Sequence, residues 1–150
     1  MTPRFDYSKA APAGMKALGG VHVYVDQCGL PKQLVDLVYL RVSLINGCAY
    51  CIDLHSRDLI AGGVPVSKIV LVPVWHEGGE LFSARERAAL RWAETVTRVA
   101  ETGVPDAEFA AVSTQFNEKE LADLTIAIGL MNAYNRMAIS FRTTPAAAKV

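Results

Sequence analysis

The residues most able to do chemistry are two cysteines and a histidine in the stretch INGCAYCIDLHSRDL, residues 45–59. Cys48 and Cys51 are three residues apart, and His55 follows four residues later. On an α-helix, at about 100° per residue, the three side chains project from one face. Cα atoms with this spacing lie roughly 5 Å apart, a separation that a disulfide can span. The stretch therefore predicts a redox couple beside a proton carrier.

The predicted position of the cysteines, at the start of a helix, favours the reactive thiolate form. Asn46 is a favourable N-cap residue, and Gly47 relieves backbone strain at the junction. The free N–H groups at a helix start lower the pKa of a thiol, which favours Cys48 as the more acidic of the pair. A thiolate, a second thiol and His55 as proton carrier suffice for dithiol reduction of a peroxide, through a sulfenic acid and then a disulfide.

Two other interpretations of these three residues remain open. A structural zinc ion usually takes four protein ligands, so it would need a fourth from Asp36 or Cys28. Free cysteines are also common as inert residues of a hydrophobic core. The redox interpretation is favoured because both thiols and the imidazole share one face at a helix start, so we expect neither a bound metal ion nor another cofactor.

The remaining sequence predicts an all-α protein, a single-domain helical bundle of about six or seven helices over residues 1–150. Apolar residues recur at spacings of three and four, and no stretch alternates long enough to indicate a sheet. Ser83 with Glu86, and Asn117 with Glu120, have the spacing of a capping box at a helix start. The last helix, ending near Phe141, is apolar nearly all round and is expected to be a central element or an oligomer interface.

Composition and charge exclude several classes of partner. Fifteen Lys and Arg residues balance 15 Asp and Glu residues, so there is no net attraction to nucleic acid or to an anionic membrane. No apolar run approaches the ~20 residues of a membrane span, and the N-terminal residues lack the pattern of a secretory signal. A cytoplasmic protein is expected, and in that reducing compartment a close cysteine pair indicates catalytic, redox or metal chemistry.

The longer string LVYLRVSLINGCAYCIDLHSRDL, residues 37–59, resembles the carboxymuconolactone decarboxylase-like, alkylhydroperoxidase D-like family. Members of that family have an acidic residue followed by L-R-x-S-x-x-N-G-C-x-x-C-x-x-x-H, matched here by Asp36 and residues 40–55. The decarboxylase branch lacks the cysteine pair, so Cys48 and Cys51 argue against lactone decarboxylation.

Two weaker matches to the same family, FSARERAALRWAE and LMNAYNRMAISFR, extend the resemblance over nearly the whole chain. The second contains an N-x-x-N-R element at Asn132, Asn135 and Arg136. Polar side chains on an apolar helix need hydrogen-bond partners. We therefore expect a buried network that holds the turn at Asn46 and Gly47, with direct contact to substrate as the alternative.

The resemblance implies an alkylhydroperoxidase D-like helical fold that assembles as a homo-oligomer, a trimer or a hexamer. It also implies peroxidase chemistry without haem or flavin, in which Cys51 attacks the peroxide, Cys48 resolves the intermediate and meets the reducing partner, and His55 with Asp36 moves protons. The implied partners are a small alkyl hydroperoxide or hydrogen peroxide, and a thiol reductant such as a lipoyl protein, a thioredoxin-like protein or a small thiol. The rival function is a non-enzymatic helical oligomer that senses oxidants or binds a metal through the same cysteines.

The sequence departs from the family pattern near the predicted site. The usual glutamate is replaced by Asp36, which is one methylene shorter and is expected to need a bridging water to reach His55. The usual glutamine after the serine is replaced by Leu44. Arg41 is expected to neutralise Asp36 or another acid, and Asp58 is expected to face solvent.

Overall fold

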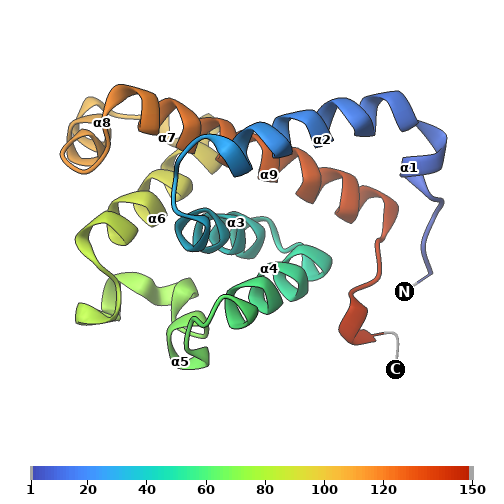
Figure 1. Ribbon diagram of the computed structural model, residues 1–150, viewed down its shortest axis with the longest axis horizontal. Coiled ribbons are helices and arrows are strands. Elements are labelled where there is room, and N and C mark those ends of the chain that lie inside the picture. The colour runs from blue at the N-terminus through green and yellow to red at the C-terminus, as the bar shows by residue number, and fades with distance from the viewer. Residues whose placement is uncertain (1, 149–150) are drawn as a thin grey trace.

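The computed structural model describes residues 2–148 as a bundle of helices, without a β-strand in that range (Figure 1). This confirms the all-α prediction. Among these residues, the α-helices of eight residues or more are α2 Pro12–Gln27, α3 Lys32–Asn46, α4 Ala49–Ala61, α6 Ala84–Thr97, α8 Asp106–Ser113 and α9 Glu118–Phe141. The shorter elements are α1 Tyr7–Ala10, α5 Val66–Ile69 and α7 Val99–Thr102, with 3-10 helices η1 Val72–Glu77, η2 Gly79–Leu81 and η3 Ala146–Ala148. No helix in the described range has the length and apolarity needed to cross a bilayer.

Helix α3 is at the centre of the molecule. Nine of its 15 residues are buried, and burial is continuous over residues 34–40. It contacts α4, α6 and α9, and Figure 1 shows α2 and α9 on one side of it and α4 on the other. A helix covered on every side must be apolar all round, which explains the continuous burial of residues 34–40. The carboxyl group of Asp36 is unusual there, because acidic residues are rarely buried.

Helix α9, predicted from its composition to be a central element or an oligomer interface, packs mainly along one face within the chain. It buries nine of its 24 residues, including Leu121, Leu124, Ile128 and Met131 at spacings of three and four. Ile126 and Ile139, in contrast, are 41% and 46% exposed. The central position therefore belongs to α3, because helices pack around α3 from several directions.

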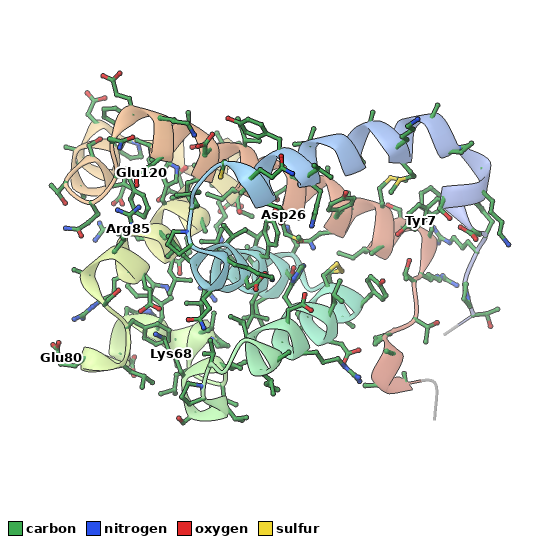
Figure 2. All side chains as sticks on the ribbon, in the orientation of Figure 1. Tyr7, Asp26, Lys68, Glu80, Arg85 and Glu120 are labelled. Carbon is green, nitrogen blue, oxygen red and sulfur yellow. A yellow bond between two sulfur atoms is a disulfide. The ribbon has the colours of Figure 1, made fainter. Side chains whose placement is uncertain are left out.

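Two capping boxes fix the starts of α6 and α9, as the sequence predicts. Ser83 and Glu86 exchange side-chain and backbone hydrogen bonds at α6, and Asn117 and Glu120 do so at α9. Glu120 also accepts a hydrogen bond of 2.7 Å from Arg85, which ties α9 to α6 (Figure 2). The helix that begins after Ser83 ends at Thr97, and the short helix α7 follows it.

Candidate functional site

The junction of α3 and α4 places both cysteines. Gly47 adopts a left-handed conformation, with φ 71° and ψ 33°, and its N–H group bonds back to the carbonyls of Leu44 and Ser43. Only glycine adopts this conformation readily, so it ends α3 after Asn46. The prediction that Asn46 caps the cysteine helix is therefore wrong. The N-cap is Cys48, which has an extended backbone and begins α4.

The two cysteines form a disulfide at the start of α4, with their Cα atoms 5.3 Å apart. The Cys48 sulfur also accepts a hydrogen bond of 3.3 Å from the backbone N–H of Cys51, as an N-cap side chain does. Both residues are buried, at 1% and 3% exposed. The spacing predicted from a helical i, i+3 pair is therefore present, and the N–H group that stabilises a thiolate points at Cys48.

Cys51, rather than Cys48, lines a pocket of about 420 Å³ between α2, α4 and α9. The other side chains that surround it are mostly apolar or aromatic, and His55 is among them. They include Met15 and His22 from α2, Leu54 from α4, and Met131 and Tyr134 from α9. Tyr7, in α1, closes the end of the pocket beside the last turn of α9 (Figure 2). A ligand in this pocket would meet the Cys51 sulfur and the His55 imidazole together.

His55 is held in its neutral form. It is 5% exposed, and its ring lies 5.1 Å from the ring of Tyr39. Burial lowers the pKa of His55 from 6.5 to about 4, and the nearby Asp58 carboxylate only partly opposes this. At neutral pH the imidazole therefore has a free lone pair that can accept a proton.

Asp58 is a residue of this site that the sequence analysis placed in solvent. One carboxylate oxygen lies 3.5 Å from Nδ1 of His55, longer than an ordinary N–H···O hydrogen bond, and the Asp58 side chain is 40% exposed. The spacing His55–Asp58 is i, i+3 on one helix, which puts both side chains on the same face. From the sequence, that spacing alone could have placed Asp58 beside His55.

Asp36 lies close to His55 but is bonded elsewhere. Its carboxylate is buried and accepts a hydrogen bond of 2.6 Å from Nζ of Lys32. One ligand atom from each of Asp36, His55 and Asp58 lies within 4.8 Å of the others. Burial raises the pKa of Asp36, and the Lys32 ammonium opposes that shift. The shorter acid therefore reaches the vicinity of the imidazole without a direct hydrogen bond to it in the described residues.

An amide network connects the cysteine junction to α9, as the sequence predicts, but only Asn135 and Ser43 in it are buried, whereas Asn46 and Asn132 are partly buried and Arg136 is exposed. Nδ2 of Asn46 donates to Oδ1 of Asn132 at 3.0 Å and to Oδ1 of Asn135 at 2.9 Å. Asn135 is fully buried and donates to the Ser43 hydroxyl at 3.0 Å. Arg136 donates to the side chain and carbonyl of Asn132. These groups position the turn that carries Cys48 and do not line the pocket.

Arg41 neutralises an acid other than Asp36. Its guanidinium lies 2.9 Å from Glu94, which also accepts a hydrogen bond of 2.6 Å from the indole N–H of Trp75. Lys32 takes the place beside Asp36 instead. Cys28, the third cysteine, is a free thiol of intermediate burial at the end of α2, outside the pocket lining.

Comparison with known proteins identifies relatives over the whole chain. The model of the carboxymuconolactone decarboxylase family matches residues 9–95. The uncharacterized protein YdfG of Bacillus subtilis strain 168 is 33% identical over 140 residues, which are 93% of this chain and 95% of that protein.

Among solved structures, ATU0492 of Agrobacterium tumefaciens, a protein of unknown function linked to AhpD antioxidant defence, is 38% identical with a TM-score of 0.92. That match covers 96% of this chain and 98% of ATU0492. A peroxidase-related protein with an AhpD core from Ralstonia eutropha JMP134 shares the fold, with a TM-score of 0.77, 24% identity, and coverage of 93% of this chain and 74% of that one. The chain therefore belongs to the carboxymuconolactone decarboxylase family and has the AhpD-like fold.

Proposed function

We propose that this protein is a thiol-dependent peroxidase that reduces hydroperoxides through Cys51 and Cys48. The observation that carries the proposal is the position of Cys51, which forms a disulfide with Cys48 and lines a pocket shared with His55. The relation to ATU0492, linked to AhpD antioxidant defence, supports the same chemistry.

The reaction begins with the reduced cysteine pair. The Cys51 thiolate attacks one peroxide oxygen, so that an S–O bond forms and the O–O bond breaks. The leaving alkoxide takes a proton and departs as an alcohol, and Cys51 becomes a sulfenic acid. The Cys48 thiolate then attacks the Cys51 sulfur, forming the disulfide and releasing hydroxide, which is protonated to water. Two electrons pass from the dithiol to the peroxide.

We assign the proton transfers of this reaction to His55, because it lines the same pocket as Cys51. As a neutral base it removes the proton from the Cys51 thiol and returns it to the leaving oxygen. Asp36 and Asp58 each bring a carboxylate oxygen within 4.8 Å of an imidazole nitrogen, so they would stabilise the imidazolium that forms between the two proton transfers. We assign Asp36 to this electrostatic task, with a water molecule as the bridge, because its carboxylate is hydrogen-bonded to Lys32 and not to His55.

The pocket lining favours an organic hydroperoxide over hydrogen peroxide. Met15, Leu54, Met131 and Ala138 offer apolar surface to the substrate's organic group. Apolar contact of this kind contributes about 0.8 kcal/mol per buried methylene, which hydrogen peroxide does not gain. We therefore expect a higher kcat/KM for an alkyl hydroperoxide than for hydrogen peroxide.

Reduction of the disulfide is proposed to start at the sulfur that faces the pocket. A reductant thiolate that attacks Cys51 forms a mixed disulfide and expels Cys48 as a thiolate. Cys48 is a good leaving group because the N–H of Cys51 points at its sulfur. The resemblance to the family implies instead that Cys48 meets the reductant, and this residue is 1% exposed in the described structure. The second thiol of a dithiol reductant then releases Cys51.

The test compares peroxide consumption by three purified proteins supplied with dihydrolipoamide. Cys51→Ser is expected to lower the rate to that of the reductant without protein. Cys28→Ser removes a thiol outside the pocket, so it is the matched control and should keep the wild-type rate. Equal rates for Cys51→Ser and the wild type would contradict the proposal.

A further inference from the structure

Three potential metal ligands converge beside the pocket that His55 lines. Asp36 comes from α3, and His55 and Asp58 come from successive turns of α4. One ligand atom from each lies within 4.8 Å of the other two. Two carboxylate oxygens and an imidazole nitrogen suit Zn²⁺ better than Mg²⁺ or Ca²⁺, which prefer oxygen ligands alone.

An unpartnered nitrogen points into this cluster. His55 is 95% buried, and its Nδ1 atom has no hydrogen-bond partner in the described part of the chain. The nearest acidic oxygen belongs to Asp58, at 3.5 Å. A buried ring nitrogen without a partner costs free energy, and most such groups in proteins are satisfied by protein, water or an ion. A cation bound between His55 and Asp58 would satisfy it.

The side chains around the cluster carry more negative than positive charge, which favours binding of a cation. Lys32 donates a hydrogen bond of 2.6 Å to Asp36, and Asp26 and Asp58 lie near enough to attract the same ammonium group. His22 lies 3.5 Å from Asp26 and adds a positive charge only when it is protonated. Three carboxylates therefore face one permanent cation.

The Lys32 ammonium neutralises Asp36 at the position that a metal ion could take. Its side chain is 75% exposed and reaches Asp36 from outside, so it can swing into solvent. A cavity of about 260 Å³, lined by Asp26, Lys32 and Asp36 among others, lies on that side between the end of α2 and α3. Figure 2 labels Asp26 on α2. An ion therefore has a route to Asp36 that does not pass through the peroxide pocket.

We propose that Asp36, Nδ1 of His55 and Asp58 form a binding site for a divalent transition-metal ion, with Zn²⁺ as the expected occupant and water completing the coordination. Tetrahedral zinc with ligands at about 2.0–2.1 Å brings the ligand atoms to roughly 3.3 Å from one another. The cluster closes to that size when Lys32 withdraws and Asp58, whose side chain is 40% exposed, moves inward. No cysteine takes part.

The effect of a bound ion on peroxide reduction rests on the proposed function. An ion on Nδ1 fixes the tautomer and orientation of His55 and holds two acids that neighbour it. It would therefore withdraw the imidazole from proton transfer and suppress peroxide reduction. The binding test below measures no turnover, so its outcome is independent of whether the protein is a peroxidase.

The experiment titrates Zn²⁺ by calorimetry into the oxidised full-length chain carrying Cys28→Ser. In that protein the disulfide occupies both remaining cysteines, so no free thiol competes for the ion. One ion per chain is expected. His55→Gln and Asp58→Asn should each weaken Zn²⁺ binding by at least about 10- to 100-fold. Loss of a residue that only hydrogen-bonds a metal ligand already has an effect of that size. Asp53→Asn, on the same helix but paired with Arg57, is the matched control and should bind as the parent does.

A second pair of variants tests the cluster without removing a ligand. Lys32→Gln removes the competing ammonium and should tighten Zn²⁺ binding. Lys16→Gln removes the same charge from an exposed position on α2 and should leave the affinity unchanged. Absence of Zn²⁺ binding, unchanged affinity in both ligand variants, or equal affinities for the two lysine variants would each overturn the site.

Discussion

At the scale of single residues, His55 shows how the local environment sets a protonation state. Its burial against the Tyr39 ring lowers its pKa to about 4, although Asp58 favours the charged form. The unfolded chain has the ordinary pKa of 6.5, so between these two values it binds a proton that the folded chain does not. Folding stability that depends on neutral His55 is therefore present above pH 6.5 and is lost as the pH falls toward 4.

This difference predicts that His55→Gln flattens the pH dependence of stability. Relative to the variant, the wild type should lose about 3 kcal/mol of unfolding free energy as the pH falls through that window. Asp36, whose pKa burial raises, acts in the opposite direction in both proteins and cancels from the comparison. Urea unfolding at a series of pH values measures the effect. His76→Gln changes an exposed histidine and serves as the control. Parallel curves for His55→Gln and the wild type would refute the explanation.

The sequence predicted some members of the site and missed others for a physical reason. Cys48, Cys51 and His55 follow from spacing along one helix, which needs no knowledge of packing. Lys32, the partner of Asp36, lies four residues before it on the same face of α3, whereas Arg41 lies five residues after it, about 140° around the helix and out of reach. Glu94, the partner of Arg41, comes from α6, and spacing along one helix does not reveal it.

At the scale of secondary-structure elements, the junction of α3 and α4 carries the site. The helices themselves were predicted closely, since strong apolar periodicity and two capping boxes mark them. The cap of α4 was misassigned because Asn46 and Cys48 can both begin a helix. The left-handed Gly47 decides between them by ending α3 first.

The amide network predicts a stability cost when the junction is released from α9. Asn135→Ala should lower the free energy of unfolding by about 2 kcal/mol, because it leaves the Ser43 hydroxyl without this donor and opens a small cavity. Urea denaturation at neutral pH measures the change. Ser140→Ala, at an exposed position of the same helix, should change stability by less than about 0.5 kcal/mol. Equal losses in the two variants would show that the network contributes little.

At the scale of the whole molecule, α2 lies on the surface with much of its apolar side uncovered. Only Val25 of its 16 residues is buried, whereas Val21, Val23 and Tyr24 are 37%, 52% and 47% exposed. Exposed apolar surface of this kind marks contact with another molecule. It fits the homo-oligomer that the resemblance implies, with a second copy of the chain against α2.

We expect the purified protein to have the mass of a trimer or a hexamer of the 16.2 kDa chain in light scattering after gel filtration. Val23→Asp should shift that mass downward, because a charge buried at the interface is costly. Val70→Asp, which adds the same charge at a residue 61% exposed outside α2, should leave it unchanged. A single-chain mass for the wild type at all concentrations would contradict the predicted assembly.

The central claim is that Cys51 and Cys48 together reduce one hydroperoxide, and single-turnover oxidation tests it most directly. The fully reduced protein is mixed with one equivalent of tert-butyl hydroperoxide, and mass spectrometry then identifies the oxidised cysteines while the alcohol is quantified. The predicted result is one alcohol formed per Cys48–Cys51 disulfide, with Cys28 still reduced. Oxidation of Cys28 alone, or alcohol formation without loss of the Cys48 and Cys51 thiols, would contradict the proposed mechanism.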